Sequence, residues 1–406
     1  MKILHLNVRL QEGGAARIAL DLHRQLQAGG CESRLGYGWG ERGGASSAQH
    51  SIPHSFQVGN RLQVAGNMLL HRLFGVDFLA PSGDGQQQLK AALHWADVVH
   101  LHVIHSYFLP FRQLVQALLD AGKPVVWTAH DYWMLTGRCA FTEGCVSWRD
   151  GCGACLRVNN YPPVWLDWSA AQFKRRRQAL ASLGNLLHVI CPSEFVAQAF
   201  KAGLPDTRVS VIANWLDSEF EAALQGISLP ESALCLNKPV LKVLVMANDL
   251  ADSSKVNRLV INPLLAMEHV ELHTIGLGSP FTGANVVNHG RIESRARLVQ
   301  IIVAADLAVF TSEKDTFGLV MIEALACGVP VFATESQAAS EVLAVLGLTP
   351  AGSQQTLLDL LRDKRLPACY RARSAASLRN TVLKHYAAEP AIQRYRQSYA
   401  YALSCR

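Results

Sequence analysis

The sequence has few charged residues and no long hydrophobic run. Of its 406 residues, 17% are Asp, Glu, Lys or Arg and 50% are hydrophobic, which excludes an intrinsically disordered chain. No run of about 18 apolar residues occurs, so we expect no transmembrane helix. The net charge of +6 is mild: it permits attraction to anionic ligands or to an anionic membrane, and we expect no nucleic acid among the partners.

The N-terminus also lacks the features of a signal peptide. Residues 2–8 form a short apolar run without a small-residue cleavage site, which predicts a first β-strand and a cytoplasmic protein. The ten cysteines then indicate free thiols or a metal site rather than a disulfide framework. A chain of 406 residues is too long for one ordinary core and predicts two domains of roughly 150–200 residues each.

The most informative stretch runs from residue 307 to residue 332. It predicts a strand at 307–310, a Gly-containing loop, an apolar helix ending at Cys327-Gly328, and a second strand at 329–332. Two carboxylates, Asp315 and Glu323, fall in the loop and in the first part of the helix. This βαβ arrangement places acids where α/β folds bind ligands, beside a helix N-terminus whose free N–H groups favour anions.

The pattern Asp315-Thr316-Phe317-Gly318, followed by Glu323-Ala324 and Gly328-Val329-Pro330-Val331, resembles the donor-binding signature of the family 4 retaining glycosyltransferases. Asp315 stands where that family usually has Glu, and Thr316 where it has Gly. Since threonine rarely adopts positive φ, this predicts a different loop conformation. The resemblance implies an α/β protein with the GT-B fold, in which two Rossmann-like domains face each other across a deep cleft.

The resemblance also implies an activity. Such an enzyme transfers a sugar from a nucleotide diphosphate sugar to a hydroxyl group, with retention of the anomeric configuration. The implied acceptor is an undecaprenyl-linked oligosaccharide, and no metal or other cofactor is needed for catalysis. Two alternatives remain open from the sequence: a nucleotide-sugar epimerase with the GT-B fold, and a non-catalytic subunit that binds a nucleotide sugar.

Roles in the donor site follow from the same resemblance. Asp315 would hold hydroxyls of the donor sugar and support positive charge at the anomeric carbon, and Glu323 would bind the ribose. Lys255 would bind the diphosphate. The remaining predicted donor-site residues are Phe317, Gly318 and Leu319, of which the last two would offer backbone N–H groups to the diphosphate.

One cation of the family pattern is missing from this site. The family has an Arg after the strand at 241–247, whereas this sequence has Asn248 and Asp249 there. Because negative charge develops on the leaving diphosphate, another cation should replace it. Arg258 and Arg291 are the candidates, and Arg291 is included in the predicted site.

In the N-terminal half, Gly13 and Gly14 follow the first predicted strand and open a helix. The glycines let the backbone approach a ligand, and the resemblance places this loop near the acceptor and the donor diphosphate. His102 and His130 each follow a buried strand, where α/β sites are built. By resemblance His130 faces the transferred sugar and is, with Asp315, a predicted catalytic residue.

An insertion at residues 136–160 carries Cys139, Cys145, Cys152 and Cys155. The Gly151-Cys152-Gly153-Ala154-Cys155 segment has the form of a zinc knuckle, and four thiolates suit a structural tetrahedral Zn²⁺. The alternative is a cluster of free or paired cysteines. A similar four-Cys loop occurs in a subset of bacterial exopolysaccharide glycosyltransferases, including colanic acid enzymes.

Two segments suggest contact with the inner face of the cytoplasmic membrane, on which we expect a peripheral association. Residues 61–73 have an amphipathic helical pattern with Arg61 and Arg72, so this helix could lie on a membrane or pack on its domain. Residues 174–177 are four consecutive cations that could meet phospholipid or the acceptor's diphosphate, or form a solvated face.

These observations give three predicted segments. Residues 1–220 form an acceptor-side domain that includes the four-Cys insertion. Residues 221–375 form the domain that binds the nucleotide sugar. Residues 376–406 form a helical segment that returns to the first domain.

Overall fold

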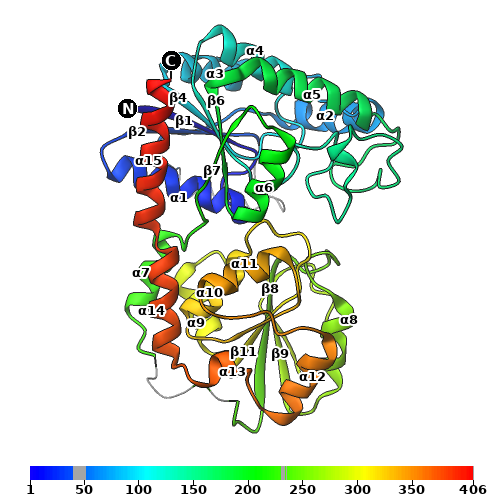
Figure 1. Cartoon of the computed structure of the whole chain (residues 1–406), viewed down its shortest axis with the longest axis vertical. Coiled ribbons are helices and arrows are strands. Elements are labelled where there is room, and N and C mark those ends of the chain that lie inside the picture. Colours follow the sequence, from blue (N-terminus) through cyan, green and yellow to red (C-terminus); the bar gives the residue numbers. More distant parts are fainter. Residues whose placement is uncertain (40–51, 230–233, 235, 406) are drawn as a thin grey trace. The chain divides into compact units, whose positions relative to one another are not determined.

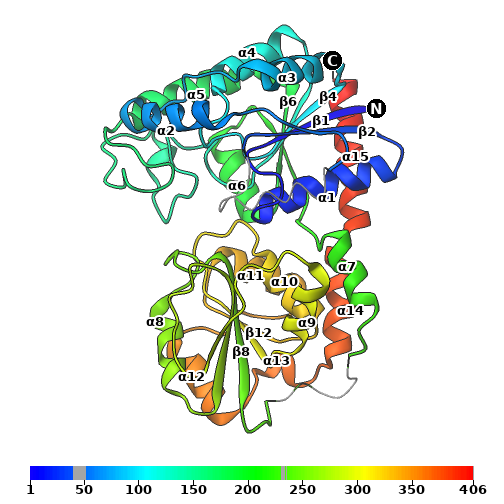
Figure 2. The ribbon, with the colours of Figure 1, turned by 180° about the vertical axis from the view of Figure 1, so that it is seen from behind.

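The computed structural model describes residues 1–39, 52–229, 234 and 236–405, and in it the chain forms two compact units (Figures 1 and 2). The first unit comprises Met1–Ile212 together with Ile392–Arg406, and the second comprises Ala213–Ala391. No helix among the described residues is both long and apolar enough to cross a membrane.

The first unit is built on a seven-stranded sheet of order β3-β2-β1-β4-β5-β6-β7, with every strand pair parallel. The strands are β1 (Lys2–Asn7), β2 (Glu32–Tyr37), β3 (Ser55–Gln57), β4 (Val98–Leu101), β5 (Val125–Thr128), β6 (Leu187–Cys191) and β7 (Arg208–Val211). The sequences of β4 and β5, VVHL and VVWT, are buried at every position, as expected for parallel strands covered on both faces.

Helices cover both faces of this sheet. They are α1 (Gly14–Ala28), α2 (Arg61–Phe74), α3 (Gly83–Trp95), α4 (Phe111–Asp120), α5 (Ser169–Leu183), α6 (Glu194–Gly203) and the end of α15 (Ala388–Ser404), with short 3₁₀ turns at Ser147–Arg149 and Gly184–Leu186. In Figures 1 and 2, α3, α4 and α5 lie together on one face, whereas α1 and α15 lie on the other.

The core of the first unit contains an unusual number of histidines. His5, His23, His100, His102 and His188 are all buried, and His5 lies opposite His100 in the register of β1 and β4. His5, His23 and His188 each have a polar partner within the first unit. Both ring nitrogens of His100 are also paired, with Tyr399 Oη at 2.7 Å and with Thr128 Oγ1 at 2.8 Å. Buried polar groups persist in a core only when they are hydrogen-bonded in this way.

The second unit has a five-stranded parallel sheet of order β10-β9-β8-β11-β12. Its strands are β8 (Leu241–Asp249), β9 (Val270–Leu277), β10 (Val286–Asn288), β11 (Leu307–Phe310) and β12 (Val331–Ala333). Its helices are α7 (Ser218–Gln225), α8 (Arg258–Ile261), α9 (Arg295–Val303), α10 (Leu319–Ala326), α11 (Gln337–Val345), α12 (Gln354–Asp363), α13 (Ala368–Arg371) and α14 (Ala375–Tyr386), with a 3₁₀ turn at Asn262–Ala266.

The unit boundaries differ from those predicted at residues 220 and 376. The first unit ends at Ile212, because Phe220 and Leu224 of α7 are buried in the core of the second unit. Val382 and Tyr386 of α14 are buried in that same core. The terminal segment therefore joins the first unit only from Ile392 onward, where Tyr395 and Tyr399 are fully buried.

The buried histidines predict that the protein loses stability in mild acid. Burial lowers the pKa of His5, His100 and His102 well below 6.5, and that of His23, His130 and His188 to about 4. Below pH 6.5 the histidines of the unfolded chain bind protons that the same histidines in the folded state do not bind. The free energy of unfolding is therefore highest above that pH and falls as the pH approaches 4.

Each such histidine should remove about 1 kcal/mol of unfolding free energy between pH 6.5 and 5.5, giving a loss of several kcal/mol in total. Urea unfolding followed by circular dichroism at a series of pH values measures this loss. A free energy of unfolding that stayed constant from pH 7 to pH 5.5 would contradict the neutral state of these rings.

Candidate active site

Two loops of the second unit lie together at one edge of its sheet. β8 and β11 are parallel neighbours, so the loops that follow them, residues 250–257 and 311–318, leave the same edge. The backbone N–H of Glu313 donates to the carbonyl of Ser254 at 3.1 Å, and that of Asn257 donates to Thr311 Oγ1 at 2.9 Å. These bonds fix the relative position of the two loops.

Lys255 and Asp315 meet where these loops join. The Lys255 ammonium forms an ion pair with the Asp315 carboxylate, and the two side chains are 25% and 24% exposed. A second pair, Lys314 with Asp252 at 3.0 Å, joins the same loops. The structure thus brings together the residue predicted to bind the diphosphate and the residue predicted to bind the donor sugar, and it leaves both side chains accessible to solvent.

The loop after β11 ends at Gly318, the N-cap of α10. Gly318 has φ of +87°, and a Cβ there would lie 2.6 Å from Met321 Cε, so only glycine fits without strain. Thr316 is not among the described non-glycine residues with positive φ, so threonine costs this backbone nothing. Phe317 is buried and packs edge-to-face on Tyr386, with ring centroids 5.4 Å apart; its ring belongs to the core.

Glu323 lies on α10 and is 9% exposed. Its Oε1 accepts a hydrogen bond from Arg295 Nη1 at 3.3 Å, and Arg295 also forms an ion pair with Asp217. Arg295 was not predicted from the sequence, because it begins a helix far from both acids and only the fold reveals its partners. Its charge compensates the two buried carboxylates and orients Glu323.

The two candidate replacements for the missing Arg lie at different points of the same sheet edge. Arg258 begins α8, and its Nη2 lies 3.5 Å from the carbonyl oxygen of Ala251. Arg291 follows β10, the strand at the far side of β9. Since all strands are parallel, both arginines lie at the carboxyl edge, and Arg258 is the one adjoining the Lys255 loop.

The predicted residues of the first unit are gathered at the carboxyl edge of three adjacent strands, β1, β4 and β5. Gly13 is the N-cap of α1 with φ of +88°, which glycine adopts readily, and Gly14 begins the helix. His130 Nε2 lies 3.0 Å from His102 Nδ1. His130 is half-buried, and burial lowers its pKa to about 4, so the ring is neutral near pH 7.

A second polar pair at this edge was missed by sequence reasoning. His105 Nε2 lies 2.8 Å from Asp131 Oδ2, and His105 Nδ1 lies 2.7 Å from Ser106 Oγ. Ser106 and Tyr107 both have positive φ, at 81° and 77°. Such conformations are costly outside glycine and gather at functional sites. The close spacing of His100, His102 and His105 in the sequence could have indicated that His105 belongs to this edge.

The four cysteines of the insertion are neighbours in the structure. Burial is the main cause that raises the pKa of Cys139 to about 11, and the other three cysteines raise it further. The N–H of Gly137 donates to Cys152 Sγ at 3.2 Å. Among the described residues, only His5, His100 and His102 offer three ligand atoms within 4.8 Å of one another, so the loop would have to close to hold a tetrahedral ion.

Helix α2 is packed on the first unit by one side and exposes apolar residues on the other. Asn67 is buried and its side chain bonds the backbone of Phe78, Leu79 and Tyr107. Exposed apolar side chains of α2 and of the segments around it form what we term the α2 face: Leu62, Met68, Leu69, Phe74, Phe78, Leu79, Trp165, Leu166 and Trp168.

A cavity of about 620 Å³ lies beside the α2 face. Its lining combines aromatic rings with guanidinium groups: Phe78, Phe111, Trp133, Arg112, Arg175 and Arg176. The four consecutive cations of α5 differ in their exposure to solvent. Arg176 is buried on the ring of Trp133 at 3.6 Å, whereas Lys174 and Arg175 are exposed.

Two family models match the chain. Glycosyltransferase Family 4 matches residues 12–220, and Glycosyl transferases group 1 matches residues 281–362. These matches cover the strand-end residues of the first unit and the Asp315–Glu323 motif of the second.

Similar proteins agree with the family models. The chain is 38% identical over 366 residues to a protein of Escherichia coli K12 named as a colanic acid biosynthesis glycosyl transferase, WcaC, covering 88% of this chain and 89% of that one. It is 29% identical over 145 residues to N-acetyl-alpha-D-glucosaminyl L-malate synthase of Bacillus anthracis, covering 32% and 37% of the two chains.

Solved structures share the fold. Sucrose-phosphate synthase of Thermosynechococcus elongatus has a TM-score of 0.61 at 14% identity, covering 100% of both chains. WaaG, a glycosyltransferase of lipopolysaccharide biosynthesis, has a TM-score of 0.58 at 14% identity, covering 99% of both. The predicted GT-B fold class is confirmed. Since one family model matches half of the chain and a relative 38% identical spans most of it, the protein belongs to glycosyltransferase family 4.

Proposed function

We propose that this glycosyltransferase moves a sugar from a nucleotide diphosphate sugar to a hydroxyl group of an undecaprenyl-linked oligosaccharide, with retention of the anomeric configuration. Its relative in E. coli is named for colanic acid biosynthesis, so we place the reaction in the assembly of an exopolysaccharide of that type. The observation that carries the proposal is the meeting of Lys255 and Asp315 beside the N-terminus of α10.

The donor site would work by an exchange of ion-pair partners. In this structure Lys255 is paired with Asp315; a bound diphosphate would take over the ammonium group and leave the carboxylate to sugar hydroxyls. The N–H groups of Gly318 and Leu319 at the start of α10 add partial positive charge. Together these groups would stabilise the charge that develops on the leaving diphosphate without a metal ion.

The remaining contacts with the donor and the sugar would come from residues near the carboxyl edge of each sheet. Glu323, oriented by Arg295, would bind the ribose hydroxyls, and Arg258 or Arg291 would supply the second cation. His130 would contact the transferred sugar, and Gly13 and Gly14 would shape the acceptor side. Asp315 is the proposed support for positive charge at the anomeric carbon.

Replacement of Lys255 by alanine should reduce kcat/KM by roughly 10²–10³-fold, because a group that stabilises transition-state charge is lost. Lys314→Ala is the matched control, since it removes the other ion pair between the same loops. It should cost less than about fivefold, as this partly exposed ion pair contributes at most about 1 kcal/mol. The assay is release of nucleoside diphosphate from a panel of nucleotide sugars.

Equal losses in the two variants would contradict a specific role for Lys255. The stereochemistry is tested on the same reaction by NMR of the glycosidic product, where an inverted anomeric centre would exclude the retaining assignment. Conversion of the nucleotide sugar without transfer would favour an epimerase instead.

We further propose that the α2 face binds the anionic surface of the cytoplasmic membrane. Contacts join its central part: the rings of Phe74 and Phe78 lie 5.6 Å apart, and Trp168 Nε1 donates to the carbonyl of Leu73 at 2.8 Å. Exposed Lys174 and Arg175 follow in the second turn of α5. Apolar groups beside cations are the pattern that binds anionic interfaces, and the Arg-lined cavity next to this face suits the phosphates of a lipid-linked acceptor.

Sedimentation with phospholipid vesicles tests this surface. The double variant Leu69→Glu, Phe74→Glu should bind vesicles containing phosphatidylglycerol at least about tenfold more weakly than the unaltered chain, because it places two carboxylates against lipid phosphates. Val345→Glu is the control, since Val345 is also exposed but lies in the second unit. Unchanged binding of the double variant would exclude the α2 face.

We also propose a structural zinc ion on Cys139, Cys145, Cys152 and Cys155. The donor set suits Zn²⁺. The N–H group aimed at Cys152 Sγ would stabilise a thiolate, and the positive φ of Cys152 and Ala154 gives the turn a knuckle-like form. Four protein ligands leave no open coordination position, so the ion would stabilise the loop and take no part in the reaction.

Zinc content of the purified chain, measured by mass spectrometry, should be about one ion per chain. Cys152→Ser should lower it severalfold, because a four-ligand site loses a thiolate, whereas Cys369→Ser of the second unit should leave it unchanged. Equal zinc content in the two variants would remove the proposal.

A further inference from the structure

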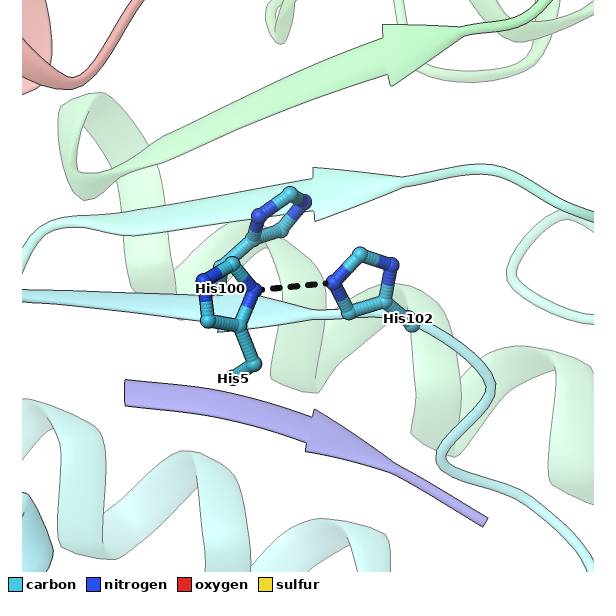
Figure 3. A group of neighbouring side chains, drawn as sticks. All are labelled: His5, His100 and His102. Atoms are coloured by element: carbon cyan, nitrogen blue, oxygen red, sulfur yellow. Dashed lines mark hydrogen bonds between the residues drawn. The ribbon is translucent and has the colours of Figure 1, made fainter. Parts of the chain in front are cut away.

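Three histidines of the first unit form a continuous row from the core to the strand-end residue His130. His5 Nδ1 lies 3.1 Å from His102 Nε2, and His102 Nδ1 lies 3.0 Å from His130 Nε2. The rings are stacked at 5.4 Å and 5.3 Å between centroids. They come from β1 and from the ends of its successive neighbours β4 and β5, and Figure 3 shows the contact between His5 and His102.

A row of neutral imidazoles must have a direction. Burial lowers the pKa of all three rings, so each carries one N–H group and one lone pair. His102 uses both of its nitrogens, so it donates to one neighbour and accepts from the other. Protons therefore point either all toward His130 or all toward His5.

The inner end of the row decides between these directions. Among the residues that the structure describes, Nε2 of His5 has no hydrogen-bond partner, and the side chain is fully buried. If His5 donates through Nδ1, this unpaired nitrogen is a lone pair. If the row runs the other way, it is an N–H group. A buried N–H group without an acceptor is the rarer and more costly case.

We propose that all three rings are protonated on Nδ1, so that His5 donates to His102 and His102 donates to His130. His5 and His102 are then positioning residues. They make Nε2 of His130 an acceptor inside the protein, and the other nitrogen of His130 carries the proton. His130 thus acts as a hydrogen-bond donor and not as a base. That it donates to the transferred sugar rests on the function proposed above, whereas the direction of the row does not.

A metal ion explains the cluster less well. His5, His100 and His102 offer ligand atoms within 4.8 Å of one another. Both nitrogens of His100 are already bonded, to Tyr399 and Thr128, and both of His102 are bonded to His5 and His130. An ion would have to displace a hydrogen bond at each of these two rings.

NMR of the full chain labelled with ¹⁵N-histidine tests the direction, because protonated and unprotonated ring nitrogens resonate far apart. Signals are assigned by comparison with His5→Asn, His102→Leu and His130→Gln. We expect the Nδ1–H tautomer at all three positions near pH 7.5. An Nε2–H tautomer at His130 or His102 in the unaltered chain would overturn the proposal, whatever the variants do.

The influence of His102 on His130 is tested in the same spectra. In His102→Leu the donor to His130 is lost, so the two nitrogen signals of His130 should move toward each other as both tautomers become populated. His188→Leu is the matched control, because His188 is buried in the same sheet and pairs with Ser210 instead. A His130 signal unchanged in His102→Leu would exclude the positioning role.

Kinetics separate this proposal from the proposed function. His102→Leu should lower kcat by about tenfold with a smaller change in KM, since a residue that orients a ligand-contacting ring typically contributes 10–100-fold, and kcat should show no ionisation of His130 between pH 6 and pH 8. If His130→Leu transferred sugar at the unaltered rate, the sugar contact would be refuted while the tautomer result would stand.

Discussion

Both sheets are parallel throughout, and the candidate site depends on this constraint. In a parallel sheet the carboxyl ends of neighbouring strands lie at the same edge, so residues distant in sequence meet there. His102 and His130 come together in this way in the first unit, as do Lys255 and Asp315 in the second. The chemistry of each unit is therefore set by the few residues that follow its strands.

The two units solve the burial of polar groups differently. The core of the second unit is almost wholly apolar, and its buried charges are concentrated at Arg295, between Asp217 and Glu323. The first unit also buries charged side chains, such as Arg138 and Arg176. In addition, neutral histidines occupy core positions there and are paired with hydroxyl groups or with one another. Neutral rings avoid the large free-energy cost of burying a charge, but they are stable in the core only while their hydrogen bonds remain intact.

The sequence was sufficient to predict the fold class, the strand-end histidines and the motif around Asp315, because these depend on local hydrophobic patterns and on a recognisable spacing. It could not predict Arg295, whose partners come from distant helices, nor the burial of Phe317, nor the role of His5 in the middle of a strand. The boundary at residue 220 was misplaced for a similar reason: α7 carries no local sign that Phe220 packs in the second core.

The segment that completes the first unit, from Ile392 onward, also imposes an order on synthesis. Tyr395 and Tyr399 fill the core beside Thr128 and His100, yet they leave the ribosome only after the whole second unit. The second unit, being one continuous segment, can reach its final fold while the chain is still growing. The first unit, although translated first, must wait with an open helix-binding face until the segment that starts at Ile392 has left the ribosome, so nascent chains expose this surface to chaperones while the second unit is being made.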